Sequence, residues 1–290
     1  MSGFVGYWGC GAQQELEALL TRCLEALPGT SHRINLTDAY SNGRHPISAG
    51  LACWGTDARQ ERETRNQPHS LAASLSVSGI STDQDVWAHT DDNCLRLGRE
   101  SFGRATLYWT QLNGAVWFAS RLQTLLPILE CRDVSIAGLY GYTCFSFVPA
   151  PLTPVKNVFA VPAGSESAWR IDGGSKTHST FTREIARLSE WREGDRQVRS
   201  EDKAILELRS LLEDSIRRQV DDLPGGPVAV FLSGGLDSAV TAALLARAGV
   251  SARAYTLDFG EYGFSEVPYA ERVAQVLSIP LVKVPVSPRQ

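Results

Sequence analysis

The residues best suited to chemistry lie in "FLSGGLDSA", where an apolar segment gives way to an alanine-rich one. Gly234 and Gly235 stand between Ser233 and Ser238, with Asp237 close behind. Glycine lets a ligand approach the backbone closely, and serine hydroxyls can donate hydrogen bonds. If a strand ends and a helix begins here, the backbone N–H groups form an anion site at the positive end of the helix dipole. The pattern therefore predicts that residues 233–238 bind phosphate or pyrophosphate.

Asp237 needs a separate explanation, because a carboxylate beside a bound phosphate would repel it. A magnesium ion shared by Asp237 and the phosphates would remove that repulsion. The alternative is purely structural: Gly234 and Gly235 form a turn, and Asp237 caps the following helix. The stretch lacks the lysine of a GxxxxGK(S/T) loop and the spacing of GxGxxG. It therefore supports neither a P-loop nucleotide hydrolase nor a dinucleotide-binding fold.

The elements that must position this stretch alternate between strands and helices. Ser200 is a plausible N-cap, and the apolar residues after it follow a helical period, namely Ile205, Leu208, Leu212, Ile216 and Val220. We then expect strands at 227–233, 252–258 and 281–286, separated by helices at 237–249 and 267–278. This alternation predicts a parallel, doubly wound sheet, which binds ligands beyond the carboxyl ends of its strands.

The first half of the chain has mostly strand patterns. "CLRLGRESFGRATLYWTQLNGAVWFAS" alternates on both sides of Asn113-Gly114 and predicts a hairpin. Residues 70–79 and 154–171 predict further strands, the second interrupted by Pro162 and Gly164. Residues 12–27 predict a helix with an apolar face made by Leu16, Leu19, Leu20, Cys23 and Leu24. The polar residues 172–202 are expected to form a linker or a surface excursion.

Length and composition limit the function classes. A chain of 290 residues with 43% hydrophobic residues is expected to form two globular domains. Its net charge of -4 and its scattered basic residues give no stripe for a nucleic-acid backbone. No apolar run reaches bilayer length and no signal-peptide pattern begins the chain, so we expect a cytoplasmic protein without nucleic-acid or membrane partners. The six scattered cysteines have no metal-site spacing and are expected to be mostly buried.

The motif "LSGGLDS" resembles the pyrophosphatase loop of ATP-dependent enzymes that adenylate a carboxyl or carbonyl oxygen, and among them it is most similar to the asparagine synthetase family. "YTLDFGEYGFSEVPYAERVA" resembles the segment that follows this loop in that family. The resemblance implies ATP and magnesium as cofactors. It implies that Leu232 and Leu257 flank the adenine and that Asp237 lies near magnesium. The phosphates would be held by the loop residues Ser233, Gly234, Gly235, Leu236, Asp237 and Ser238.

A second resemblance covers the first half. "SGFVGYWG", "LGRESFGRATLYW", "WFASRLQTLLPI" and "PAPLTPVKNVFAVPAGS" are similar to parts of the class II glutamine amidotransferase domain that precedes the synthetase domain in the same family. The two resemblances imply an α+β Ntn-hydrolase-like αββα sandwich over residues 1–195. They imply an incomplete α/β parallel-sheet domain, similar to adenine nucleotide α-hydrolases, over residues 196–290.

The sequence departs from the family at the amidotransfer site. The family places a nucleophilic cysteine after the initiator methionine, and this chain has Ser2. A hydroxyl is a much poorer nucleophile than a partly ionised thiol, so Ser2 is only a minor catalytic candidate. The family's glutamine-pocket loops have weak counterparts in "SNGRHPISAG", with Arg44, His45 and Pro46, and in "LSVSGISTDQD". We therefore expect no glutaminase activity, as in the β-lactam synthetases and lasso-peptide cyclases that the chain also resembles.

The sequence ends after three predicted strands, whereas the resemblance implies further acceptor-site elements. The expected function is an ATP-dependent amide-forming ligase that activates a small-molecule or peptide carboxylate. The alternatives are one subunit of a split enzyme, whose second chain supplies the remaining half, an intramolecular cyclase, or a non-catalytic nucleotide-binding remnant. A three-strand unit leaves apolar faces uncovered, which favours association with another chain. An RNA-modifying enzyme with the same loop is disfavoured by the acidic charge balance.

Overall fold

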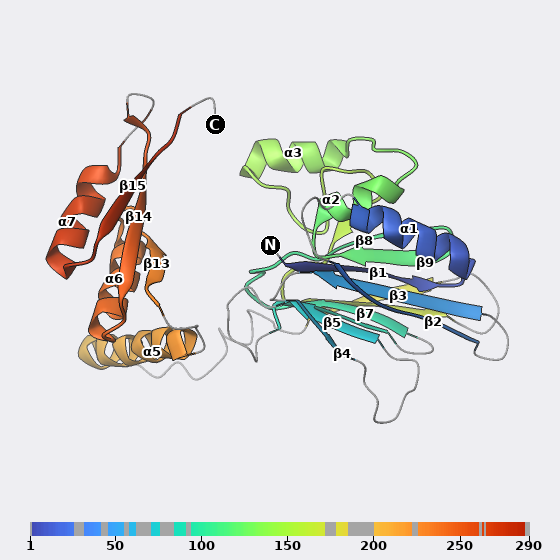
Figure 1. Ribbon diagram of the computed structural model, residues 1–290, viewed down its shortest axis with the longest axis horizontal. Helices are drawn as coiled ribbons and strands as arrows, with labels where there is room; N and C mark the ends of the chain where they lie inside the picture. Colours follow the sequence, from blue (N-terminus) through green and yellow to red (C-terminus); the bar gives the residue numbers. More distant parts are fainter. Residues whose placement is uncertain are drawn as a thin grey trace. The chain divides into compact units, whose positions relative to one another are not determined.

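The computed structural model describes residues 2–25, 32–41, 46–54, 58–61, 71–75, 84–90, 94–171, 178–184, 200–221, 226–260, 263 and 265–287. The chain divides into two compact units, Met1–Asp195 and Arg196–Gln290 (Figure 1). Among the described residues, no helix is both long enough and apolar enough to cross a membrane.

The first unit contains two antiparallel sheets of six strands each. The first sheet has the order β10-β8-β9-β1-β3-β2 and the second has the order β12-β11-β7-β6-β5-β4. The strands of the first sheet are β1 (Gly3–Gly9), β2 (His32–Ser41), β3 (Pro46–Trp54), β8 (Tyr108–Leu112), β9 (Ala115–Ala119) and β10 (Phe159–Ala160). Those of the second are β4 (Ala58–Glu61), β5 (Leu71–Leu75), β6 (Val86–Thr90), β7 (Cys94–Arg99), β11 (Ser165–Ile171) and β12 (His178–Glu184).

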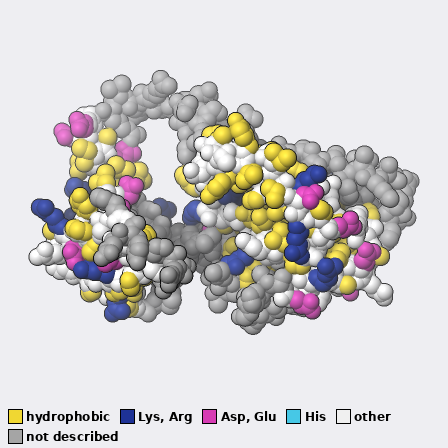
Figure 2. Space-filling view, turned by 90° about the horizontal axis from the view of Figure 1, so that it is seen from above, with side chains coloured by type: hydrophobic (Ala, Val, Ile, Leu, Met, Phe, Trp, Pro, Cys, Tyr) yellow, Lys and Arg dark blue, Asp and Glu magenta, His cyan; other side chains and the backbone are white. Residues whose placement is uncertain are grey.

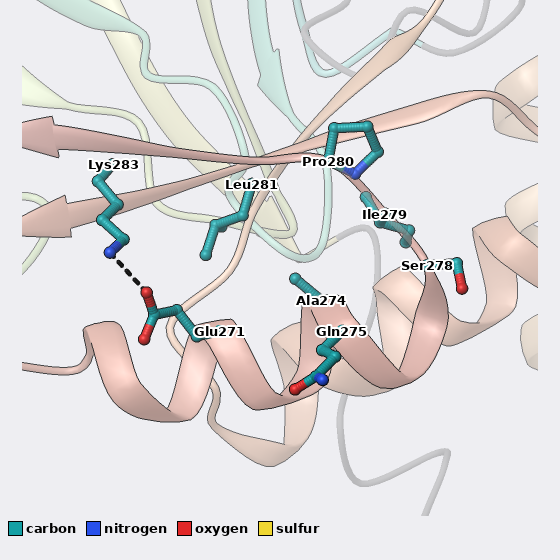
Figure 3. Close-up of a pocket in the computed structure, with 8 residues that line it drawn as sticks. All are labelled: Glu271, Ala274, Gln275, Ser278, Ile279, Pro280, Leu281 and Lys283. Carbon is teal, nitrogen blue, oxygen red and sulfur yellow. Dashed lines mark ion pairs between the residues drawn. The ribbon is translucent and has the colours of Figure 1, made fainter.

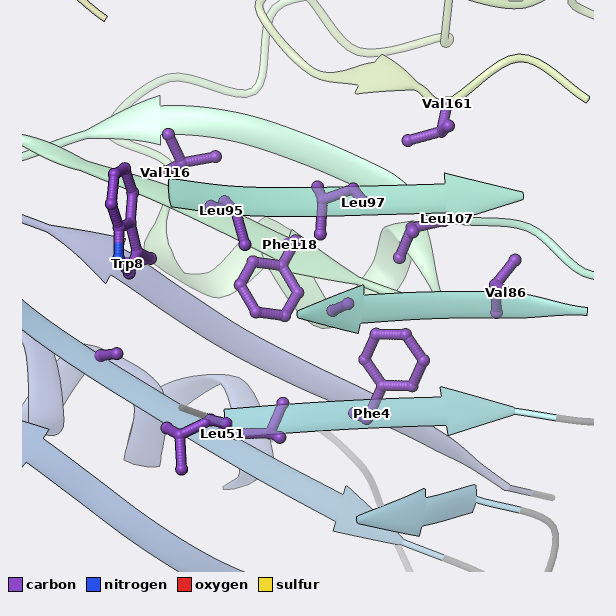
Figure 4. Packing of buried hydrophobic residues seen from close by; sticks show 14 of the residues in the cluster. Phe4, Trp8, Leu51, Val86, Leu95, Leu97, Leu107, Val116, Phe118 and Val161 are labelled. Carbon is purple, nitrogen blue, oxygen red and sulfur yellow. The ribbon is translucent and has the colours of Figure 1, made fainter. Parts of the chain in front are cut away.

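The main core lies between these two sheets (Figure 4). Phe4, Leu51 and Phe118 from the first sheet meet Val86 and Leu97 from the second, and all five are almost fully buried. Side chains alternate between the two faces of a strand, so one set fills this layer while the other faces away. The alternation in the sequence thus becomes a closed apolar layer between the sheets.

A helical layer covers the other face of the first sheet. It comprises α1 (Gln13–Glu25), α2 (Leu122–Leu125) and the short 3₁₀ helix η1 (Leu126–Ile128). The prediction for residues 12–27 is confirmed, because the buried side chains of α1 are the predicted ones, Leu16, Leu19, Leu20, Cys23 and Leu24. Sheets with apolar residues on both faces need such a cover, and β1 is buried along its whole length.

The observed layers are α, β and β. The predicted αββα sandwich also needs helices over the outer face of the second sheet, and none of the buried clusters in the described ranges contains such a helix. The structure therefore supports a mixed fold with two stacked sheets, and the fourth layer stays a prediction.

The turn at Asn113-Gly114 is as predicted, since both residues have positive φ, 52° and 74°, between the paired strands β8 and β9. The preceding strand β7 does not belong to this hairpin, because it pairs with β6 and β11 in the other sheet. Likewise, the break at Pro162 and Gly164 separates β10 and β11, which lie in different sheets.

One segment predicted as linker contains a strand. β12 lies within residues 172–202 and pairs with β11 along seven residues. It is the last strand of its sheet, and an edge strand tolerates a polar sequence such as "HSTFTRE" because only one side must pair. Its polarity concealed it from a search for apolar runs.

Helix α3 (Ile136–Phe145) presents large apolar side chains to solvent. Gly138 and Gly141 are its buried residues, and the segment 149–153 approaches them so closely that a Cβ on Gly141 would lie 2.6 Å from Pro149 Cδ. The helix therefore packs through its glycines and exposes Ile136, Tyr140 and Phe145. Figure 2 shows hydrophobic side chains gathered on the face of the first unit that carries α3.

The second unit is a three-stranded parallel sheet with the order β13-β14-β15. Its elements are α5 (Glu201–Asp221), β13 (Val228–Phe231), α6 (Leu236–Arg247), β14 (Ala252–Asp258), α7 (Val267–Leu277) and β15 (Leu281–Pro285). Val230, Ala254 and Ala242 belong to a core that α6 and α7 form against one face of the sheet. The predicted alternation and the parallel pairing of residues 227–286 are confirmed.

The predicted apolar face of α5 is only partly used. Ile216 and Val220 pack against the core of the second unit, and Glu213 accepts hydrogen bonds from Arg247 of α6. Ile205 and Leu208, however, are 48% and 58% exposed. The sequence period identified the helix correctly but could not show which of its turns would meet a neighbour.

Candidate functional site

The candidate site is the loop of residues 232–235, which joins β13 to α6. β13 pairs with β14, and the Leu232 amide extends that pairing by donating to the Tyr255 carbonyl at 2.8 Å. α6 begins at Leu236 after Gly235, whose φ of -70° and ψ of 163° are extended. The loop therefore lies at the carboxyl edge of a parallel sheet, where the sequence predicted a ligand site.

Gly234 is the residue whose backbone only glycine accommodates well. Its φ is +81°, and an added Cβ would lie 2.7 Å from the Tyr269 carbonyl carbon and 2.8 Å from the Ala270 nitrogen. Those atoms belong to the first turn of α7 and cannot move aside as a flexible side chain could. The loop therefore packs against α7 at a residue that has no side chain of its own.

Gly235 has a different role, because its φ is ordinary and a Cβ there would meet only Ser233 Oγ, at 3.3 Å. Its amide donates to Ser233 Oγ at 3.3 Å. The two glycines that look alike in the sequence thus differ in structure. Gly234 satisfies a steric and conformational demand, while Gly235 leaves an exposed backbone at the N-terminus of α6.

The first amides of α6 are well placed for an anion. In any α-helix the first N–H groups have no carbonyl four residues earlier within the helix. Within the described part of the chain, no hydrogen bond is formed by the amides of Leu236, Asp237 and Ser238, and the first intrahelical-type bond runs from Ala239 to the Gly235 carbonyl at 3.0 Å. These donors and the helix dipole favour a negative charge at this position.

Asp237 lies in the first turn of α6 with its side chain exposed. No group of three or more metal-ligating side chains occurs among the described residues. A single exposed carboxylate does not make a resident metal site, but it suits magnesium, which proteins often hold with one or two carboxylates plus substrate phosphates. The donor set therefore fits magnesium that arrives with a nucleotide.

The two leucines predicted to flank adenine occupy different environments. Leu232 is 1% exposed and belongs to the core of the second unit, so it could contact a nucleotide only through its backbone. Leu257, at the end of β14, is 45% exposed. Of the two side chains, only that of Leu257 is accessible to a ligand.

A pocket of about 580 Å³ in the second unit is separate from the loop. It lies between the end of α7 and β15, where Lys283 pairs with Glu271 at 2.5 Å (Figure 3). β14 stands between β15 and β13, and none of the predicted site residues lines this pocket. The sequence motif and this pocket therefore do not coincide.

Ser2 precedes β1 and is half-buried. A Cβ on the next residue, Gly3, would lie 2.5 Å from Ser120 Oγ and 2.8 Å from Trp54 Cε2, and Ser120 Oγ accepts the Phe4 amide at 2.9 Å. These contacts fix the start of the chain between β3 and the end of β9. The glutamine-pocket loops were predicted at Arg44, His45 and residues 75–85. Arg44, His45 and most of residues 75–85 lie outside the described residues.

None of the cysteine thiols whose pKa is shifted is activated as a nucleophile. Burial raises the pKa of Cys23 and of Cys53 to about 12, and it also raises the pKa of Cys10. A hydrogen bond to Asp133 raises the pKa of the exposed Cys131. Each of these shifts disfavours the thiolate, which is the reactive form.

The loop "GRESFGR" contains structural residues that the sequence did not single out. Glu100 accepts the amides of Phe102 and Arg104, both at 2.6 Å. Arg104 reaches the fully buried Asp85 at 2.7 Å, and Arg99 donates to the Gly103 carbonyl at 2.7 Å. The charged residues of this motif therefore stabilise a turn. Their spacing in the sequence did not predict this role, because the partner Asp85 lies outside the motif.

Comparisons with known proteins include the residues of this loop. Residues 207–290 match the family model described as asparagine synthase. The chain is 30% identical over 205 residues to asparagine synthetase (glutamine-hydrolyzing) 1 of Bacillus subtilis (strain 168), covering 71% of this chain and 30% of that protein. It is 26% identical over 181 residues to putative asparagine synthetase (glutamine-hydrolyzing) 2 of Methanocaldococcus jannaschii, covering 60% and 33%. The chain thus spans about a third of the length of these relatives.

A solved glutamine phosphoribosylpyrophosphate amidotransferase from B. subtilis overlaps 98% of this chain and 81% of its own, with 9% identity and a TM-score of 0.34. That TM-score is too low to support a statement about fold. The matches in sequence cover both units and include the glycine loop. By these matches, the chain is similar to asparagine synthetases over part of their length.

Proposed function

We propose that the second unit binds ATP at residues 233–238 and that the chain takes part in ATP-dependent amide formation. The observation that carries the proposal is the loop at the carboxyl edge of the parallel sheet, where Leu236, Asp237 and Ser238 present amides without partners. The same residues fall inside the stretch that matches the asparagine synthase model. Phosphate oxygens are acceptors, and these amides are donors held in place before any ligand arrives.

The proposed reaction activates a carboxylate. The substrate carboxylate attacks the α-phosphate of ATP, an acyl-adenylate forms, pyrophosphate leaves, and an amine then displaces AMP. The chain's own contribution is to hold the leaving phosphates through the amides of α6 while magnesium, shared with Asp237, offsets their charge. Leu257 is the accessible apolar side chain for the adenine.

For the first unit we propose an Ntn-hydrolase-like fold that has lost glutamine hydrolysis. Ser2 stands where the family has its cysteine, and the four thiols with shifted pKa values are less acidic than usual. We expect the purified protein to release no glutamate from glutamine, and Ser2→Ala to change nothing. Glutamate release that Ser2→Ala abolishes would contradict this. Without glutamine as donor, the amine would come from ammonia or from the substrate itself, as in an intramolecular cyclase.

A second candidate function is a nucleotide-binding subunit that depends on another chain for catalysis. The exposed face of the three-stranded sheet favours it, since Phe231 is 82% exposed and Val282 is 37% exposed. Pyrophosphate release from ATP in the presence of candidate carboxylates distinguishes the two functions. Release by this chain alone supports the ligase, and binding of ATP without release supports the subunit.

Calorimetry with ATP and Mg²⁺ tests the shared premise. We expect wild-type protein to bind ATP and Asp237→Ala to weaken that binding in the presence of Mg²⁺, with a smaller effect when EDTA replaces the metal. Asp202→Ala is the matched control, because Asp202 is also an exposed aspartate in the first turn of a helix, α5. Equal losses for the two variants, or no binding by the wild type, would reject the proposal.

A further inference from the structure

The pocket between α7 and β15 carries different chemical groups at its two ends (Figure 3). Lys283 and Glu271 form an ion pair at one end. Ser278 lies at the other end, where α7 stops. Figure 3 shows apolar side chains between the two ends, namely those of Ala274, Ile279, Pro280 and Leu281. The pocket therefore has a charged end, an apolar middle and a polar end.

The α7 side of the pocket is elongated. Glu271, Ala274, Gln275 and Ser278 are spaced three or four residues apart, which places them on one face of the helix. Seven positions separate the first from the last, so this face is about 10 Å long at about 1.5 Å per residue. The pocket volume of about 580 Å³ lies in the range of small-molecule sites. Its shape therefore suits an elongated small molecule better than a compact ion.

Lys283 provides the positive end of the pocket. Its ammonium group carries three hydrogens, and the ion pair with Glu271 Oε1 uses one of them. Lys283 and Glu271 are 48% and 49% exposed, and a pair of such exposed groups contributes little to stability. A ligand carboxylate can therefore bind Lys283 at little cost to the protein.

The end of α7 provides hydrogen-bond acceptors and a negative potential. The carbonyl groups of the last turn carry the negative end of the helix dipole. Pro280 has no N–H, so it cannot donate to the Val276 carbonyl four residues earlier, as a continuing helix would. The Ser278 hydroxyl and the Gln275 side-chain carbonyl are further acceptors, and both residues line the pocket. An ammonium group, which only donates hydrogen bonds, matches this end.

We propose that this pocket binds an elongated zwitterion, with its carboxylate at Lys283 and its ammonium group at the end of α7. The apolar chain between the two charges would lie along Ala274 and Leu281, and a ligand with only one of the charges would use only half of the pocket. The proposal does not rest on the proposed ATP site. β14 stands between β15 and β13, and no residue of the glycine loop lines the pocket.

The experiment follows the backbone amide resonances of the full chain by NMR while 6-aminohexanoate is added. This probe carries its two charges at opposite ends of an apolar chain. Pentylamine and hexanoate are the same molecule without the carboxylate and without the amine, respectively. We expect 6-aminohexanoate to shift the amides of residues 271–283 and to bind at least about tenfold more tightly than either control, the usual effect of one hydrogen bond to a charged group.

Two variants test the charged end with opposite expected signs. Lys283→Met keeps a chain of similar length without the charge, and it should weaken binding of 6-aminohexanoate about tenfold while leaving that of pentylamine unchanged. Glu271→Gln removes the carboxylate that competes for Lys283, so it should tighten binding of 6-aminohexanoate about two- to fivefold, the usual strength of an exposed ion pair. Lys203→Met, at an exposed lysine of α5, is the control.

Three results would overturn the inference. They are equal affinities for hexanoate and 6-aminohexanoate, weaker binding by Glu271→Gln, and shifts confined to residues outside 271–283. The amide spectrum away from the pocket shows whether each variant is folded. A chain that binds ATP but not 6-aminohexanoate contradicts this inference alone, whereas one that binds 6-aminohexanoate but not ATP contradicts only the proposed function.

Discussion

The two units of this chain cover their sheets differently. In the first unit, one sheet has its two faces covered, by the second sheet and by a helical layer, and its side chains Trp8 and Trp117 are fully buried. In the second unit, α6 and α7 cover one face of the parallel sheet, while Phe231 and Leu257 on the other face remain exposed. The first unit is therefore the better enclosed one. The comparison teaches that one unit closes both faces of a sheet, whereas the glycine loop of the other unit is well formed on a sheet that is covered on one face.

The largest expected difference concerns two phenylalanines. Phe118 is 1% exposed and Phe231 is 82% exposed. We expect Phe118→Ala to lower the free energy of unfolding of the first unit by about 3–5 kcal/mol. Phe231→Ala should change that of the second unit by less than about 0.5 kcal/mol, as for surface positions.

The chain allows the two units to be followed separately. All seven tryptophans precede residue 196, so tryptophan fluorescence during chemical denaturation reports on the first unit, and hydrogen exchange of β13–β15 reports on the second. A large destabilisation by Phe231→Ala would show that its face of the sheet is covered in the protein, and the contrast between the units would fail.

The next effect is expected at Gly234. Its positive φ and the backbone of α7 both oppose a side chain, and a strained φ alone costs about 1–3 kcal/mol. Gly234→Ala should therefore destabilise the second unit by at least that amount and abolish nucleotide binding, measured by hydrogen exchange and calorimetry. Gly249→Ala is the matched control, because Gly249 has φ of +70° but nothing within 4 Å of the added Cβ. Equal effects of the two substitutions would remove the contact with α7 from the explanation.

A smaller contrast comes from two ion pairs, one in each unit. Arg104 pairs with Asp85, whose side chain is fully buried, although Arg104 itself is 39% exposed. Removing the arginine takes a charged partner from a buried carboxylate, and we expect Arg104→Ala to lower the stability of the first unit by about 1–3 kcal/mol. Tryptophan fluorescence during urea denaturation measures it. No loss would mean that the turn of residues 99–104 does not depend on this pair.

The smallest effect is expected at the counterpart in the second unit, where Lys283 and Glu271 are both about half exposed. The hydrogen bond with Glu271 raises the pKa of Lys283, so any contribution is present below the usual lysine pKa and is lost only as the pH rises through the raised value. We expect Lys283→Met to leave unfolding unchanged from about pH 6 to 9. A salt-sensitive loss of stability at neutral pH would show a stronger pair than its exposure suggests.

Local patterns predicted much of this structure. The period of residues 12–27 identified every buried side chain of α1, and the alternation after residue 226 predicted the three strands and the two helices from β13 to β15. Asn113-Gly114 predicted its hairpin because those residue types accept positive φ. These features depend on neighbours close in sequence.

Features that depend on distant partners were not predictable in the same way. β7 and β8 follow one another in sequence but pair in different sheets, and β12 is recognisable only through its pairing with β11. In the site, the motif identified Gly234 but not the turn of α7 against it. It also predicted that Ser233 and Ser238 can donate hydrogen bonds, but not that their two hydroxyls would lie 3.1 Å apart.

The contact between Gly234 and Tyr269 has a consequence for how these two residues tolerate mutation. Gly234 faces the Tyr269 carbonyl carbon, the Ala270 nitrogen and the Tyr269 Cβ. Nearly any amino acid at residue 269 would supply the same atoms. In a library randomised at both positions, residue 269 should accept many replacements and residue 234 almost none. Selection for a folded loop would thus act on one side of a contact and leave the other side free to drift.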